Sequence, residues 1–108
     1  MENPYHEPTE FINYGHNILE RIKQYYEKPL KGFFSSDENG FSYTISTERK
    51  FFKILPKRVA IVKMLFNDKS HRRPEVEIKD RRKRKEIQDK VYEINYELVQ
   101  DLTKKNYL

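Results

Sequence analysis

The sequence has no cysteine and no tryptophan among its 108 residues. Without cysteine there is no disulfide framework, no thiolate metal site and no cysteine nucleophile. No apolar run approaches the ~18 residues that a membrane-spanning helix needs, and the first ten residues lack the basic and apolar regions of a secretion signal. We therefore expect a soluble protein of a reducing compartment, with no membrane partner: the cytoplasm or, in a eukaryote, the nucleus.

Charged and aromatic side chains are both abundant. Charged residues make up 36% of the chain, a fraction typical of disordered proteins, but eight tyrosines and seven phenylalanines supply enough apolar surface for a core. A chain of this length can bury one modest core and not two. We therefore expect a single α+β domain over residues 1–108, with a flexible arm at 1–8.

The first predicted element is a helix over residues 9–27. Its apolar residues recur at helical spacing, Thr9 can cap its start, and Pro29 stops it. Gly15 lies inside this helix and costs about 1 kcal/mol relative to alanine. Its presence suggests that another element packs close to the helix at that point.

Residues 32–55 have the pattern of a small antiparallel β-meander. Phe41, Tyr43 and Ile45 alternate with small polar residues, which is typical of a half-buried strand. The dipeptide at 39–40, Asn-Gly, favours a tight hairpin turn. We expect 33–36 to pair with 41–46 and a third strand to follow at 50–55.

The remaining residues, 56–108, are predicted to be mainly helical. Segment 57–66 fits either a helix or a buried strand, and we favour the helix because Pro56 suits a first turn and Asn67-Asp68 a stop. A short helix can follow Pro74. Asp80 is placed to cap a long final helix, whose apolar residues recur at intervals of three and four. These residues are Ile87, Val91, Ile94, Leu98 and Leu102.

Positive charge is concentrated in residues 69–85. Nine lysines and arginines lie there against three acidic residues, while the whole chain has a net charge of +5. Such a field attracts polyanions, and the mixture of Arg and Lys suits phosphate contacts better than base reading. A solvated surface or a localisation signal are the alternatives. The candidate nucleic-acid-binding residues are Lys69, Arg72, Arg73, Lys79, Arg81, Arg82, Lys83, Arg84 and Lys85.

Other functional classes find little support in the residue pattern. Phe41 and Tyr43 could stack on bases, but an alternating strand in a small domain buries one face, so we expect them in the core. His6, His16 and His71 lack metal-ligand spacing, and there is no phosphate-binding glycine loop or nucleophile elbow. We expect no enzyme activity, no metal and no cofactor.

The leading hypothesis is a non-catalytic nucleic-acid-binding protein with a regulatory or accessory role, and DNA is favoured over RNA as its ligand. The alternative is a protein-interaction module that self-associates or binds an acidic partner through the final helix. That helix has an apolar stripe wider than a thin domain can cover. The residues of this candidate partner interface are Val91, Tyr92, Tyr96 and Val99.

The stretch ILPKRVAIVKMLFND, residues 54–68, combines a proline-lysine opening with apolar residues at helical spacing, and a second candidate helix and the long final helix follow. Residues 41–104 in this respect resemble the winged-helix effector domain of response-regulator transcription factors, without that family's wing. The resemblance implies helices at 54–68 and 74–80 and a DNA-recognition helix at 85–102. It further implies that four residues approach the groove or its flanking phosphates: Arg81, Arg82, Lys83 and Arg84.

Overall fold

The structure, a computed structural model, describes residues 4–47, 57–67 and 73–106. It holds two α-helices, four β-strands and three short 3₁₀ turns. In chain order these are η1 (Pro4–His6), α1 (Pro8–Ile22), η2 (Lys23–Tyr25), β1 (Leu30–Ser36), β2 (Gly40–Thr47), β3 (Arg58–Leu65), β4 (Glu75–Ile78), η3 (Arg81–Lys83) and α2 (Arg84–Asn106).

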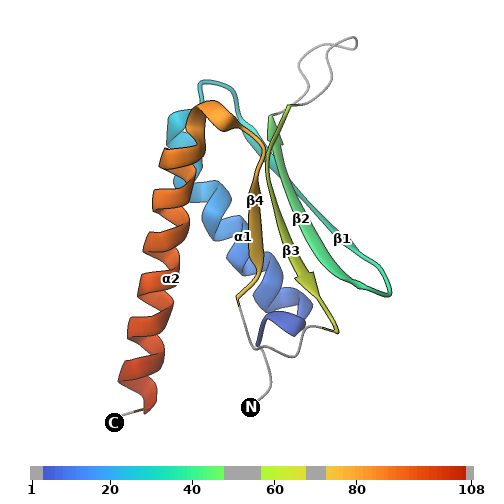
Figure 1. The fold of residues 1–108 in the computed structure, drawn as a ribbon, viewed down its shortest axis with the longest axis vertical. Helices are drawn as coiled ribbons and strands as arrows, with labels where there is room; N and C mark the ends of the chain where they lie inside the picture. Colours follow the sequence, from blue (N-terminus) through green and yellow to red (C-terminus); the bar gives the residue numbers. More distant parts are fainter. Residues whose placement is uncertain (1–3, 48–56, 68–72, 107–108) are drawn as a thin grey trace.

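The four strands form one antiparallel sheet in the order β1-β2-β3-β4, so each strand lies beside its neighbour in the sequence. Both helices lie on the same side of this sheet, and α2 runs on past the sheet at its far end (Figure 1). The predicted α+β class is confirmed, with a helix first, a meander in the middle and a long helix last.

The predicted first helix forms, but Thr9 does not cap it. The helix begins at Pro8, whose fixed φ suits a first turn, so Thr9 lies inside the helix and its side chain is not a cap. The helix buries Phe11, Ile18 and Ile22. Gly15 packs directly on the sheet: a Cβ at this position would lie 2.6 Å from Cδ1 of Tyr43. The close approach that Gly15 suggested is therefore confirmed.

The predicted hairpin is also confirmed. Phe34 pairs with Tyr43 and Phe33 with Thr44, in a ladder that runs the whole length of β1. Its turn is held by Asp37, whose Oδ1 accepts hydrogen bonds from the backbone N–H of residues 39 and 40, at 2.8 and 3.0 Å. The third strand predicted at 50–55 lies outside the described residues.

Segment 57–66 is a strand, and the helix predicted there is wrong. β3 pairs with β2 on one side and β4 on the other, and it buries four consecutive residues from Val59 to Val62. Three of those four are β-branched, which suits a pleated central strand better than a helix. Pro56 and Asn67-Asp68 mark the ends of an element but do not select its type.

The short helix allowed after Pro74 is likewise wrong. β4 alternates two acidic residues with Val76 and Ile78, which pack against the core. The acidic Glu77 points to the opposite face and pairs with Lys63 of β3 at 3.1 Å. Where the winged-helix resemblance implies two helices, the described residues therefore form the strands β3 and β4.

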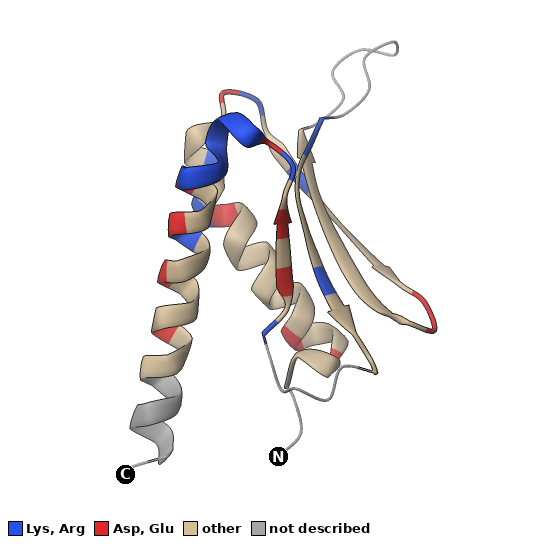
Figure 2. Cartoon of the chain, viewed as in Figure 1, with Lys and Arg blue, Asp and Glu red and all other residues tan. Residues whose placement is uncertain are grey.

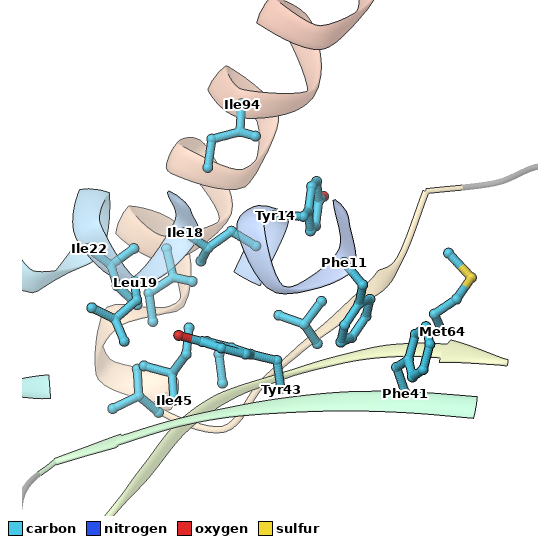
Figure 3. Close-up of a cluster of buried hydrophobic side chains, with 14 residues drawn as sticks. Phe11, Tyr14, Ile18, Leu19, Ile22, Phe41, Tyr43, Ile45, Met64 and Ile94 are labelled. Carbon is cyan, nitrogen blue, oxygen red and sulfur yellow. The ribbon is translucent and has the colours of Figure 1, made fainter. Parts of the chain in front are cut away.

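The core lies between the helices and the inner face of the sheet (Figure 3). Ile94 of α2 points toward Tyr14 and Ile18 of α1, above the strand residues. The Tyr14 hydroxyl donates to Asn95 Oδ1 at 2.8 Å, which fixes α2 against α1 at the middle of its length. Burial raises the pKa of Tyr14 to about 12, so this hydroxyl stays protonated. The first half of α2 is thus fixed rigidly relative to the sheet.

Candidate nucleic-acid interface

The start of the last helix is anchored by a buried carboxylate. Asp80 is only 4% exposed and, as predicted, caps the helical segment: its Oδ1 accepts from the Arg82 backbone N–H at 3.2 Å. The Tyr26 hydroxyl donates to Oδ2 at 2.7 Å, and Lys57 Nζ lies 3.4 Å from Oδ1. One side chain therefore joins the end of the first helical region, the start of β3 and the start of η3.

These contacts also set the ionisation of Asp80. Burial alone would raise the pKa of this carboxyl, but the Tyr26 hydrogen bond, the Lys57 charge and the Arg82 N–H outweigh it, so the pKa falls below its ordinary value. Burial and the hydrogen bond to Asp80 raise the pKa of Tyr26. The anchor is thus a carboxylate with a neutral tyrosine at neutral pH.

The five cations after Asp80 make up η3 and the first residues of α2. Four of them are exposed and Lys83 is half-buried. In the described part of the chain, none of the five side chains forms an ion pair. They sit at the positive end of the helix macrodipole, which disfavours cations there. Figure 2 shows this run as a continuous blue segment at one end of the molecule.

The fold adds cations that the sequence did not group with this run. Arg58 begins β3 and Lys57 directly precedes it. Both lie at the same end as the run, because Lys79 and Asp80 both donate their backbone N–H to the Val59 carbonyl. The basic pair after Pro56 is visible in the sequence, but only strand pairing brings it to this end. We call the resulting surface the cationic end. It consists of Lys57, Arg58, Lys79, Arg81, Arg82, Lys83, Arg84 and Lys85.

A groove of about 420 Å³ opens beside this surface, between β4 and the start of α2. Arg81, Arg84 and Gln88 recur at intervals of three and four, so they lie along one face of the helical segment. In the described residues no strand pairs with the other edge of β4. The groove is lined by Val76, Glu77, Ile78, Lys79, Arg81, Arg84 and Gln88.

Not all nine predicted binding residues gather here. Lys79 and residues 81–85 do, but Arg73 precedes β4 and therefore lies at the opposite end of that strand. Its charge acts on Tyr5 and Tyr14, near the start of α1, where it lowers their pKa values against the larger effect of burial. Lys69 and Arg72 lie outside the described residues.

The middle of α2 differs in charge from its start. Glu93 and Glu97 face Arg21 of α1, whose guanidinium donates to both, and the contact with Glu97 is bidentate. This hydrogen bonding lowers the pKa of Glu97. Arg21 also donates through Nε to Asn17 at 3.1 Å. These acidic residues therefore take part in packing α2 on α1.

The candidate partner interface divides in two. Val91 is half-buried and packs against the core. Tyr92, Tyr96 and Val99 are 64%, 66% and 41% exposed and share one face of α2 at intervals of four and three. Of the four predicted interface residues, these three therefore remain exposed to a partner.

The predicted core position of Phe41 and Tyr43 is confirmed, since they are 8% and 5% exposed. Of the histidines, His6 packs near Phe66 and His16 lies 3.6 Å from Glu20, while His71 is outside the described residues. The described residues contain no cluster of three metal-ligating side chains and no helix long and apolar enough to cross a membrane.

Comparison of the chain with family models, with curated proteins and with solved structures found no match.

Proposed function

We propose that this protein binds nucleic acid without catalysis, through phosphate contacts made by the cationic end. The observation that carries the proposal is the five-residue run 81–85, in which no side chain has an internal anionic partner among the described residues. Repulsion among the five cations is unfavourable, and the positive end of the helix dipole adds to it. A bound polyanion would offset both the repulsion and the dipole interaction.

The residue types suit phosphate oxygens. Arg81 and Arg84 line the groove and can present planar guanidinium groups for bidentate contacts, while Lys79 adds a point charge beside them. The Asp80 anchor and the packing of α2 on α1 hold these side chains on a rigid base. Rigid placement reduces the ordering cost of binding.

The mechanism is electrostatic capture followed by backbone docking. Counterions released from the nucleic acid supply the driving force, and affinity therefore falls steeply with salt. The acidic residues of α2, such as Glu93 and Glu97, lie farther along the helix and disfavour phosphates there. Phosphate contact is thus confined to one end of the molecule, and α2 does not lie along a groove.

The test is fluorescence anisotropy with labelled duplex and single-stranded DNA and RNA over a salt series. With about five phosphates contacted, log affinity falls with log salt at a slope of roughly −4 to −5 on duplex and −3 to −4 on single strands. A variant with Arg81, Arg82 and Arg84 as Gln should lose at least tenfold in affinity at low salt and flatten the slope by about two or more.

A matched control removes the same charge elsewhere, with Arg73, Lys104 and Lys105 as Gln. Arg73 precedes β4 and therefore lies at the opposite end of that strand, and Lys104 and Lys105 lie about 30 Å along α2 from Arg84. The control should therefore keep the wild-type slope and most of the affinity. Equal losses in the two variants would mean that only net charge matters. No salt-dependent binding by the folded wild-type chain would reject nucleic acid as the partner.

The second candidate function is self-association through α2. It rests on the exposed face formed by Tyr92, Tyr96 and Val99, which no described residue covers. Sedimentation equilibrium should then show that the wild-type chain is a dimer and that a variant with Tyr92 and Tyr96 as Ser is a monomer. A wild-type monomer at high concentration would reject this candidate without affecting the nucleic-acid proposal.

A further inference from the structure

The sheet has a second face that the helices leave bare. The inner face is covered, because α1 contacts β1 and β2, and α2 contacts β4. No helix in the described part of the chain covers the outer face, and both helices lie on the other side in Figure 1. This outer face begins at the cationic end, since β1 and β3 both start there.

Strand register identifies the side chains of the outer face at its cationic edge. Lys31 of β1 pairs with Ser46 of β2, and Ser46 pairs with Arg58 of β3, so the three form one row across the sheet. Neighbouring strands are about 4.8 Å apart, which places Lys31 and Arg58 roughly 10 Å from each other. Arg58 belongs to the cationic end, and the positive surface therefore continues from the start of α2 onto the sheet.

The next row carries an exposed aromatic ring. Phe33 pairs with Thr44, and Thr44 with Ile61. Phe33 is 66% exposed, whereas Phe34 beside it turns inward to Phe11 and Phe41. Phe33 lies two residues from Lys31 on the same face of β1, a rise of about 7 Å. The backbone at Phe33 thus lies about 7 Å from that at Lys31 and, diagonally across the sheet, roughly 12 Å from that at Arg58, a span of about two nucleotides of an extended strand.

The rest of this face is rich in hydroxyl groups. Their side chains form no hydrogen bond within the described residues, so they remain available to a polar ligand. β4 puts two acidic residues on this face. Glu77 is already paired with Lys63 and Lys79, at 3.1 and 2.7 Å. The exposed Glu75 lies at the end of β4 away from the cationic end. The hydroxyl-bearing residues are Ser35, Ser42, Thr44 and Ser46.

We propose that single-stranded nucleic acid crosses the outer sheet face from the cationic end, with a base stacked on Phe33 and phosphates on Lys31 and Arg58. This inference rests on the proposed function and names its ligand class. Base–aromatic stacking needs an exposed base face, which a paired duplex does not offer along its length. A protein partner fits less well, because one ring among cations and hydroxyls lacks the apolar centre of a protein interface.

Affinity for short labelled oligo(dT) and oligo(rU) gives the first test, beside a duplex of equal length. Phe33→Ala should weaken both single strands roughly 5-fold to 100-fold, the range for one lost stacking contact, and leave duplex affinity within twofold. His16→Ala is the matched control, since His16 carries an exposed ring but lies on α1, behind the sheet, and has no part in either proposed surface. A preference of the wild type for one oligonucleotide distinguishes DNA from RNA.

A spectroscopic readout makes the test independent of affinity. The chain has no tryptophan, so Phe33→Trp introduces the only indole emitter. Stacking of a base on that indole should quench its emission when oligo(dT) or oligo(rU) is added. His16→Trp places an exposed indole on α1, where addition of the same oligonucleotide should leave the emission unchanged. Circular dichroism of each variant confirms that it folds.

The results distinguish failure of the sheet-face path from failure of the proposed function. Wild-type binding that depends on Arg81, Arg82 and Arg84 but is insensitive to Phe33→Ala, with no quenching at residue 33, overturns the sheet-face path and leaves the proposed function standing. Equal or tighter binding of duplex in the wild type, again without quenching, overturns it in the same way. Absence of all salt-dependent binding rejects both proposals together.

Discussion

The beginning and the middle of α2 differ in whether their charged side chains form ion pairs. At the beginning, cations follow one another and, within the described residues, form no ion pair. In the middle, Glu93 and Glu97 meet Arg21 across the helix interface, and Tyr14 bonds Asn95 beside them. The acidic side chains in the middle are paired with a cation of α1, whereas the cations at the beginning have no ion-pair partner among the described residues.

This contrast distinguishes residues that stabilise the fold from residues available for binding. An ion pair between two elements adds to packing, although an exposed pair adds little. A cluster of like charges without partners adds nothing to folding and disfavours the compact state. Substitutions along α2 should therefore separate stability from binding, and four predictions follow from the largest expected effect to the smallest.

Ile94→Ala should cause the largest loss of stability. Ile94 is 1% exposed and lies between α2 and α1, and a Leu or Ile truncated in a core costs about 2–5 kcal/mol. Urea unfolding followed by circular dichroism measures the free energy of unfolding. Tyr96→Ala, two residues further on an exposed face, should stay within about 0.5 kcal/mol of wild type. A loss below 1 kcal/mol for Ile94→Ala would contradict the packing of α2 on α1.

Asp80→Asn should cost about 1–3 kcal/mol, since it weakens hydrogen bonds to a buried carboxylate. The pKa of Asp80 is lower in the folded chain than its ordinary value of about 3.9. Its contribution is therefore complete above that pH and is lost as the pH falls through the lower, folded value. Unfolding measured between about pH 5 and pH 2 should depend less steeply on pH in the variant. Asp89→Asn, at an exposed position of α2, should keep the wild-type profile.

Arg21→Gln should lower the melting temperature by less than half of the Asp80→Asn effect. Arg21 is 25% exposed and its two carboxylate partners about 50%, so solvent screens these pairs. High salt should narrow the difference between variant and wild type. Lys90→Gln, which breaks only the pair with Glu93 within α2, serves as control. A large loss that persists in high salt would show that the packing of the Arg21 stem matters more than its charge.

The variant with Arg81, Arg82 and Arg84 as Gln should have the smallest effect on stability, within about 0.5 kcal/mol and toward higher stability at low salt. Removal of unpaired cations relieves their repulsion and the unfavourable helix dipole. Thermal unfolding at low and at high salt measures the change in stability and shows how much of it is electrostatic. A clear destabilisation would mean that these cations have partners inside the fold, and the contrast between the two parts of α2 would fail.

The sequence predicted those elements whose local signals agree with their surroundings. The stripe of α1, the Asn-Gly hairpin and the stripe of α2 with its Asp80 cap need only residues near one another in the chain. β3 and β4 were predicted wrongly because their type depends on pairing. A run such as residues 59–62, apolar throughout, fits a buried helix or strand equally well by periodicity. The pairing of β3 with a strand on each side decided the outcome.

The candidate site divides in the same way. Sequence alone identified the basic run, because five consecutive cations are visible without any fold, and it placed Asp80 correctly ahead of them. It considered base stacking only for Phe41 and Tyr43, which it correctly expected in the core, and it passed over Phe33 on the neighbouring strand. Alternation along a strand separates two faces but does not say which face the helices will cover.

By itself, then, the sequence determined the local features of this protein: two amphipathic helices, one hairpin, a capped helix start and a dense run of positive charge. These depend on contacts a few residues apart, which propensity, capping and periodicity report directly. Tertiary structure alone brought Lys57 and Arg58 to the cationic end, removed Arg73 from it and left Phe33 exposed. Those results depend on strand order and on the side of the sheet that the helices take, and both are set by burial of the whole core.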